Sequence, residues 1–363
     1  MLHENTQALA HADYFDPAPP PPFDSERWKA IRNRLIDELA KGGKTLDDFA
    51  PDEYELGRLK IWLKSPDSFP RFSRRIGDKT MAEEIADAME ARFAEIDRAG
   101  IDYRLRCPVK VETTLTHALI EGAETARNLC EWVDFCAAPG LGKTEAKIEY
   151  IARMRKAEGF FCPVWSIDLD QSCTNLKDVL ALIARQIMGE DANYDPKSAF
   201  AMSQAIIEAT KGRRGLLFVD EGQNLADMLK KMGLPIVDML RSFVDKGCFG
   251  IVYLGNGEIY RRLCAGTGKN KNAYAQLLSR MVDFRVEFGG YRPGQPNNGK
   301  SLTKADILAV ANAWGVVGVE EESYCLQVAK ESGALRNITN VIRYSMERYG
   351  SLDIKCLKMG RAL

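Results

Sequence analysis

The feature that most limits how this chain can fold is one short stretch. In it, an apolar run, a turn of small residues and a Lys-Thr pair follow one another. Residues 132–144 read WVDFCAAPGLGKT, and a helix-forming segment comes directly after them. A buried strand that leads through such a turn into a helix is the P-loop arrangement, in which backbone N–H groups surround phosphate oxygens. We therefore predict a nucleotide site made by the following residues: Ala138, Pro139, Gly140, Leu141, Gly142, Lys143, Thr144 and Glu145.

Two side chains of this turn have separate expected roles. Lys143 would reach the β- and γ-phosphates of a nucleotide, and the Thr144 hydroxyl would bind Mg²⁺. One position departs from the motif, because Ala137 stands where its first glycine is expected. The competing interpretation is an ordinary glycine-rich turn, and the strand before it and the helix after it favour the P-loop.

A second apolar run ends in two carboxylates. Residues 215–219 read GLLFV, and Asp220 and Glu221 follow. At the carboxyl end of a buried parallel strand, Asp220 would lie in the crevice where open α/β sheets bind ligands, and would hold Mg²⁺ through water. Glu221 would orient and polarise the attacking water, because Asp220 is tied to the metal. The alternative for an acidic pair at this place is the capping of a following helix.

The order of strands and helices predicts the fold class. Apolar runs at 132–137, 159–168, 215–220, 250–256 and 283–288 alternate with helical patterns. Strands separated by helices imply right-handed crossovers and a mostly parallel sheet, so we expect an α/β P-loop NTPase core. The predicted domains are a disordered Pro-rich lead over 1–24, a helical domain of helix-turn-helix type over 25–105, the core over 106–295 and a C-terminal helical lid over 296–363.

Composition excludes several other classes of protein. No apolar run approaches the roughly 18 residues of a membrane-spanning helix, and the N-terminus lacks a basic-then-apolar signal. Nine cysteines occur without a CxxC pair and only three histidines are present, so zinc ligation is not expected and the thiols indicate a reducing cytoplasm. The net charge of −1 excludes a wholly basic nucleic-acid coat, so any DNA contact has to come from local patches.

Two local stretches are basic enough to contact a phosphodiester backbone. The first, over 58–79, interleaves basic residues with aromatic ones; the second is a glycine-rich loop over 261–273. Phosphate contacts of this kind give salt-sensitive affinity without sequence preference. For both stretches the alternative is a basic surface that contacts only water. The candidate DNA-binding residues are Arg71, Arg74, Arg75, Arg261, Arg262, Lys269 and Lys271.

The P-loop and the acidic strand end together resemble the AAA+ ATPases, and this resemblance implies three further site residues. Asn256, which ends the strand over 250–256, corresponds to sensor 1, and Arg336 at the start of a lid helix corresponds to sensor 2. Arg280 lies where these proteins carry an arginine finger that stabilises charge on the γ-phosphate of a neighbouring subunit, with Arg261 and Arg262 as rivals. The competing interpretations are an Asn-Gly turn for Asn256 and surface salt bridges for the arginines.

More narrowly, the chain resembles the MuB-like family of AAA+ transposition ATPases, which is related to TnsC and IstB. The resemblance runs from about Cys136 to Tyr344. It depends on PGLGKTEA at 139–146, GLLFVDE at 215–221, LGN at 254–256, QLLSR at 276–280, KADILAVANAW at 304–314 and GALR at 333–336. Any AAA+ protein would share the first three motifs, whereas the last two and the distance between them point to this family. The match over the N-terminal region is weak.

This resemblance implies a function, a set of cofactors and a set of partners. The expected function is ATP-dependent, largely sequence-nonspecific binding of double-stranded DNA by a helical homo-oligomer. That oligomer would deliver target DNA to a DDE transposase, activate it, and disassemble on ATP hydrolysis. ATP and Mg²⁺ are the expected cofactors, and the cytoplasm of a bacterial host is the expected location. If Arg280 acts on a neighbouring subunit, the site is complete only in the oligomer.

Two alternatives keep the nucleotide site but change what it controls. One is an AAA+ helicase loader of related build. The other is a signalling or scaffold NTPase whose nucleotide state switches protein contacts without DNA. The segment over 304–314 and the basic N-terminal stretch favour transposition over helicase loading, and the two basic stretches argue against a switch that binds only proteins.

Overall fold

The chain divides into two compact units, Met1–Asp97 and Arg98–Leu363, in the computed structural model. The finer division into four segments stays a prediction. The structure describes residues 25–40, 46–50, 57, 59–60, 63, 75–76, 79–101, 110–159, 161–169, 173, 175–189, 198–222, 224, 235–265, 278, 284–294 and 299–361.

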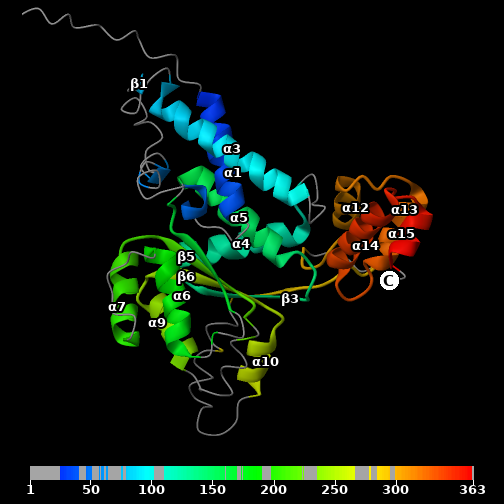
Figure 1. Ribbon diagram of the computed structural model, residues 1–363. Helices are drawn as coiled ribbons and strands as arrows, with labels where there is room; N and C mark the ends of the chain where they lie inside the picture. Colours follow the sequence, from blue (N-terminus) through cyan, green and yellow to red (C-terminus); the bar gives the residue numbers. More distant parts are fainter. Residues whose placement is uncertain are drawn as a thin grey trace, which may run out of the picture. The chain divides into compact units, whose positions relative to one another are not determined.

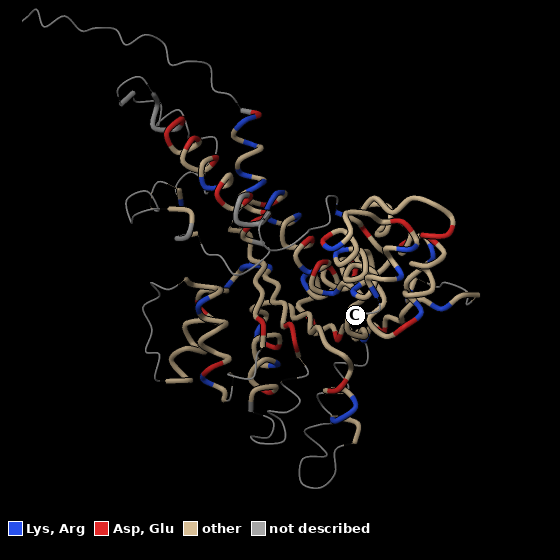
Figure 2. Tube along the Cα trace, turned by 45° about the vertical axis from the view of Figure 1, so that its right-hand side comes forward, with Lys and Arg blue, Asp and Glu red and all other residues tan. Residues whose placement is uncertain are grey.

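The N-terminal unit is built on two helices. Its elements are α1 (Ser25–Ala40), a 3₁₀ turn (Leu46–Phe49), the two-residue antiparallel strands β1 (Arg75–Ile76) and β2 (Lys79–Thr80), and α3 (Met81–Ile101). Apolar residues recur every three or four positions along α1, and Trp28, Ile31 and Leu35 are buried as that spacing predicts. Acidic residues recur along α3 (Figure 2). Arg27 of α1 pairs with two of them, Asp87 and Glu90. The two helices were expected from the sequence; the short hairpin was not.

The second unit contains a five-stranded parallel sheet in the order β4-β5-β6-β3-β7, which confirms the predicted α/β core (Figure 1). The strands are β3 (Trp132–Ala137), β4 (Val164–Asp168), β5 (Gly215–Asp220), β6 (Phe249–Gly255) and β7 (Arg285–Phe288). Every residue of β5 and β6 is buried, as expected for central strands that helices cover on both faces. All carboxyl ends of the strands meet at one edge, where ligands of such sheets bind.

Helices cover both faces of this sheet. They are α4 (Thr114–Leu129), α5 (Lys143–Glu158), α6 (Leu176–Met188), α7 (Ala199–Thr210), α9 (Pro235–Asp245) and α10 (Glu258–Cys264). On one face, α6, α7 and α9 form an apolar core that includes Trp165, Phe243 and Phe249. On the other, α4 and α5 contribute Leu119 and Tyr150 to the core, and the Tyr150 ring meets Phe218 of β5 edge-on. The helical sequence patterns over 176–188 and 199–210 predict two helices, and the structure has both, as α6 and α7.

The C-terminal helices form a separate cluster beside the carboxyl edge (Figure 1). They are α12 (Lys304–Ala313), α13 (Val319–Val328), α14 (Ala334–Tyr349) and α15 (Ile354–Arg361). Helical sequence patterns over 303–314, 320–331 and 335–349 predict the first three of these helices, and the structure confirms them; α15 was not predicted. Among the helices that the structure describes, none has the length and apolar character needed to cross a bilayer.

One buried carboxylate joins this lid to the core. Asp306 accepts hydrogen bonds from the backbone N–H and the hydroxyl of Thr303, at 2.7 and 2.9 Å, and so caps α12. It also accepts from the backbone N–H and the hydroxyl of Thr114, both at 2.8 Å, at the first residue of α4. A single side chain therefore stabilises the N-termini of a lid helix and a core helix.

Candidate nucleotide site

The turn between β3 and α5 has the backbone of a phosphate-binding loop. Gly140 and Gly142 have φ of +80° and +97°, which favours glycine at both positions, and Gly142 is the N-cap of α5 without a side-chain cap. Backbone N–H groups at this helix start are thus available to an anion. Ala137, the departure from the motif, is the last residue of β3 and pairs with Phe288 of β7. It has no positive φ, which explains why alanine is tolerated there.

The side chain of Lys143 lies within this loop. Its ammonium group donates to the carbonyl oxygens of Ala137 and Ala138, at 2.6 and 3.2 Å. Burial lowers the pKa of Lys143, and the nearby charges of Asp220 and Glu221 oppose this effect. The predicted phosphate-binding cation is therefore close to Asp220, the predicted metal ligand, and to Glu221, the predicted catalytic carboxylate.

Two hard oxygen ligands meet below the loop. The Thr144 hydroxyl donates to Oδ2 of Asp220 at 3.4 Å, and Asp220 is buried at the end of β5. A hydroxyl and a carboxylate are oxygen donors of the kind that Mg²⁺ takes, with the remaining positions left to phosphate and water. The residues present therefore fit the predicted metal.

A buried lysine that the sequence analysis missed contacts the same carboxylate. Lys147, one turn after Lys143 on α5, places its Nζ 2.8 Å from Oδ2 of Asp220 and 2.7 Å from Oδ1 of Asp168. Asp168 ends β4 and is paired in register with Asp220. A lysine three positions after Thr144 lies on the same helix face, which is the signal that could have identified it.

Glu221 follows Asp220 in a strained backbone conformation. Its φ is +52°, which is uncommon for a residue with a side chain, and its N–H donates to Oδ1 of Asp220 at 2.8 Å. The next residue holds the turn in place: Gly222 donates its N–H to the carbonyl of Leu254, and its own carbonyl accepts from the buried hydroxyl of Tyr253. The strain is thus maintained by contacts with the neighbouring strand, and it fixes the direction in which Glu221 leaves the sheet.

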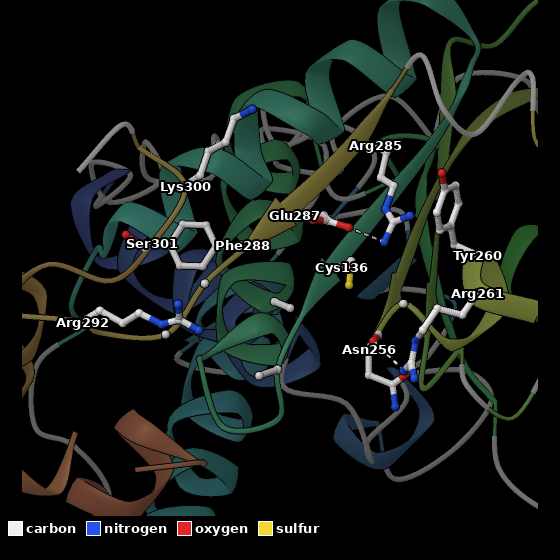
Figure 3. Close-up of a pocket in the computed structure, with 15 residues that line it drawn as sticks. Cys136, Asn256, Tyr260, Arg261, Arg285, Glu287, Phe288, Arg292, Lys300 and Ser301 are labelled. Atoms are coloured by element: carbon white, nitrogen blue, oxygen red, sulfur yellow. Dashed lines mark hydrogen bonds and ion pairs between the residues drawn. The ribbon is translucent and has the colours of Figure 1, made fainter. Parts of the chain in front are cut away.

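Asn256 follows β6 and lines a cavity of about 880 Å³ together with Ala137 and Ala138 (Figure 3). Its amide oxygen accepts the backbone N–H of Glu258 at 3.0 Å, at the start of α10. Asn256 therefore makes the hydrogen bond expected of a turn residue, and it also lies beside the P-loop. Its assignment as sensor 1 stays a prediction.

The wall of this cavity formed by β3 and β7 contains a buried ion pair. Nε of Arg285 is 3.6 Å from Oδ2 of the fully buried Asp134, and the guanidinium stacks 3.5 Å from the ring centre of Tyr260. Arg285 also points toward Glu287, 2.5 Å away (Figure 3). Neither oxygen of Asp134 accepts a hydrogen bond from the residues described, and burial raises its pKa to about 6.

The lid contacts the loop directly. The backbone N–H of Arg336 donates to the carbonyl of Gly140 at 3.1 Å, and a Cβ at Gly140 would lie 2.4 Å from the carbonyl oxygen of Gly333. Arg336 is exposed in the first turn of α14, and its charge contributes to lowering the pKa of Lys143. The predicted sensor 2 arginine therefore lies at the predicted phosphate site; its role there stays a prediction.

The other basic candidates are only partly described. Arg261 and Arg262 lie on α10 and pair with Glu258 at 3.1 and 2.8 Å, which are ordinary ion pairs within a helix. For Arg75 only the backbone of β1 is described. The candidates that lie outside the described residues are Arg71, Arg74, Lys269, Lys271 and Arg280.

Comparisons with known families match two parts of the second unit. Residues 133–263 match the AAA domain, and residues 291–347 match the C-terminal part of the Mu B transposition protein. The first match covers the P-loop and the strand ends at Asp168 and Asp220, and the second covers most of the lid. Together with the strand order they identify the fold.

Individual proteins are similar over the same region. The ATP-dependent target DNA activator B of Escherichia phage Mu is 30% identical over 209 residues, which are 57% of this chain and 57% of that protein. The match therefore spans little more than half of its length. The Mu-like prophage FluMu DNA transposition protein B of Haemophilus influenzae is 26% identical over 258 residues, 70% of this chain and 79% of that one. Among solved structures, the Aeropyrum pernix ORC1 protein in complex with DNA aligns with a TM-score of 0.44 and 16% identity, over 70% of this chain and 66% of that one.

Proposed function

Because this chain is a MuB-like AAA ATPase, we propose that it binds double-stranded DNA in an ATP-dependent manner during DNA transposition. In this proposal the chain assembles as a helical oligomer on target DNA and presents that DNA to a DDE transposase, which it activates. ATP hydrolysis then releases the DNA. These steps take place in the cytoplasm of a bacterial host.

One observation carries the proposal. The carboxyl edge of the sheet brings Lys143, the Thr144–Asp220 pair and Glu221 together under a lid whose sequence matches the Mu B C-terminal part. The AAA domain supports the use of ATP. DNA as the ligand is inferred from the names of the relatives, which are an ATP-dependent target DNA activator in phage Mu and a DNA transposition protein in the Haemophilus prophage.

Different residues of the site take different roles in ATP hydrolysis. When bound, ATP supplies the γ-phosphoryl group, and Mg²⁺ neutralises charge on its phosphates. In our assignment Lys143 and the backbone N–H groups of 140–145 hold the phosphates, and Thr144 and Asp220 hold the metal. Glu221 orients the attacking water and accepts its proton.

Three further residues would complete the site. In this assignment Asn256 positions the water from the neighbouring strand, and Arg336 contacts the γ-phosphate from the lid. Arg280 would act on the γ-phosphate of a neighbouring copy, which makes hydrolysis depend on assembly. We assign the DNA contacts to the basic stretches that include Arg74 and Arg261, because phosphate contacts suit a binder of low sequence preference.

The proposal is tested by co-sedimentation of the full chain with double-stranded DNA, with ATP, ADP or no nucleotide, at two salt concentrations. Binding should require ATP and weaken as salt rises. Lys143→Ala should abolish nucleotide binding and DNA assembly, whereas Lys156→Ala, which removes an exposed lysine from the last turn of the same helix, should preserve both. Glu221→Gln should bind ATP and remain on DNA after the parent protein has dissociated.

The opposite results would contradict the proposal in separate ways. DNA binding that is indifferent to nucleotide and salt would exclude an ATP-controlled DNA binder and favour a switch that acts on proteins. Hydrolysis by Glu221→Gln at the parent rate would show that another group orients the water.

A further inference from the structure

The ammonium group of Lys147 lies between two carboxylates at the predicted metal position. Its Nζ is 2.7 Å from Asp168 and 2.8 Å from Asp220, and Asp220 is contacted at Oδ2, the same atom to which the Thr144 hydroxyl donates. Lys147 therefore contacts the carboxylate atom that a metal at the Thr144–Asp220 pair would approach.

The two carboxylates differ in their surroundings. The side chain of Asp168 is 70% exposed and is solvated by water, whereas the side chain of Asp220 is only 7% exposed. Burying a charged carboxylate costs free energy unless a nearby positive charge or hydrogen-bond donors compensate for the lost water. Among the described cations, Lys147 is the one in direct contact with Asp220, and its own side chain is 6% exposed.

Without that ammonium group the three oxygen-bearing side chains would form a different site. Asp168 and Asp220 end neighbouring strands in register, and Thr144 adds a hydroxyl. Two carboxylates and a hydroxyl are enough hard oxygen donors to bind a divalent cation together with water. A fixed positive charge in contact with both carboxylates strongly opposes the entry of such an ion.

We propose that Lys147 is an internal counter-cation that prevents the Asp168–Asp220 pair from binding a divalent cation in the absence of nucleotide. The metal then enters only with phosphates, whose negative charge offsets the lysine. Lys147 is thus a positioning residue that couples metal binding to nucleotide binding. This inference rests on the proposed function for the identity of the metal pair.

The test uses Mn²⁺ as the probe and the nucleotide-free full chain, with binding measured by electron paramagnetic resonance of free Mn²⁺. Lys147→Met should bind Mn²⁺ at least about tenfold more tightly than the parent, because one repelling charge has been removed at contact distance. Lys147→Arg should behave as the parent. The double variant Lys147→Met/Asp168→Asn should lose most of the gain, because one carboxylate is removed. Lys156→Met on the same helix is the matched control and should bind as the parent does.

A folded Lys147→Met protein that binds Mn²⁺ no more tightly than the parent would overturn the proposal and leave Lys147 as a packing contact. If the variant is unfolded alone but folds when Mn²⁺ is added, the proposal is supported. If neither Lys147→Met nor Lys147→Gln folds even with Mn²⁺, it is overturned, because a cation bound by the pair would replace the lost charge. The titration contains neither ATP nor DNA, so its result is independent of whether the chain proves to be an ATP-dependent DNA binder.

Discussion

Replacing Asp306 by Asn should weaken the hydrogen-bonded connection between α12 of the lid and α4 of the core. The two side chains have nearly the same shape, so the substitution changes charge and hydrogen bonding alone. In the native joint Oδ1 accepts the N–H of Thr114, and Oδ2 accepts the N–H of Thr303. The two threonine hydroxyls can rotate to suit an amide, but the two backbone N–H groups cannot. An Asn side chain has one acceptor oxygen, so one of these partly buried N–H groups would face an NH₂ group.

The size of the effect follows from these contacts. A buried donor left without an acceptor costs about 1–3 kcal/mol. Loss of the negative charge at two helix N-termini costs a further amount of about 0.3–1 kcal/mol for each helix. These terms add to about 2–5 kcal/mol, and because both N–H groups are only partly buried, we expect the free energy of opening at this connection to fall by about 2–3 kcal/mol. At about 1.4 kcal/mol for each factor of ten, amide exchange there should be faster by about 30- to 150-fold.

Hydrogen exchange measured by mass spectrometry on the full chain can locate this change. Peptides from the starts of both α4 and α12 should exchange faster, while peptides from β5 and β6 should keep their protection. Asp353→Asn is the matched control, because Asp353 caps only its own helix, α15, through the N–H of Cys356. If Asp306→Asn changes exchange in α12 alone, the side chain is a simple helix cap and the inferred joint is wrong.

Three other substitutions test different parts of the second unit. Gly140→Ala should weaken nucleotide binding and lower the melting temperature, because its φ is +80° and its Cβ would meet the carbonyl of Gly333. Equal nucleotide affinity and melting temperature in variant and parent would contradict the contact between the loop and the lid. Asp134→Asn should be more stable than the parent at pH 8 by about 2–3 kcal/mol and differ little at pH 4. The folded pKa of about 6 lies above the ordinary carboxyl pKa of 3.8, so the parent loses stability as the pH rises through this window. A parallel pH dependence of unfolding in both proteins would refute this. Gly222→Ala should reduce ATP hydrolysis by at least about tenfold with nearly unchanged ATP affinity. The reason is that its Cβ would lie 2.2 Å from the ring of Tyr253 and would displace Glu221. Turnover at the parent rate would argue against this placement of Glu221.

The parts of the fold and site that the sequence predicted are encoded locally. An apolar run followed by glycines and Lys143-Thr144, or by Asp220-Glu221, carries the strand, the turn and the chemistry within a few adjacent residues. The parallel sheet then brings these strand ends to one edge, so the Thr144–Asp220 contact follows from topology.

What could not be predicted depends on how distant elements are oriented. The contact of Lys147 with two strand ends requires the rotation of α5 about its axis, which no local pattern specifies. Asp306 reads as a helix-capping residue of α12, and its second set of donors lies 192 positions away. Asn256 illustrates a different difficulty, since the same amide suits a turn and a sensor, and its observed contact serves the turn.

The contact between the phosphate loop and the lid has a consequence for building hybrid proteins. It joins the carbonyl of Gly140 to the N–H of Arg336, and it requires that Gly140 has no side chain, because a Cβ there would meet Gly333; Gly333 itself has a φ of +100°, which favours glycine. A lid taken from a distant relative could therefore be grafted onto this core and still touch the loop, whatever its surface residues, provided that both glycines are retained. The connection between the two parts is transferable because it is made by the main chain.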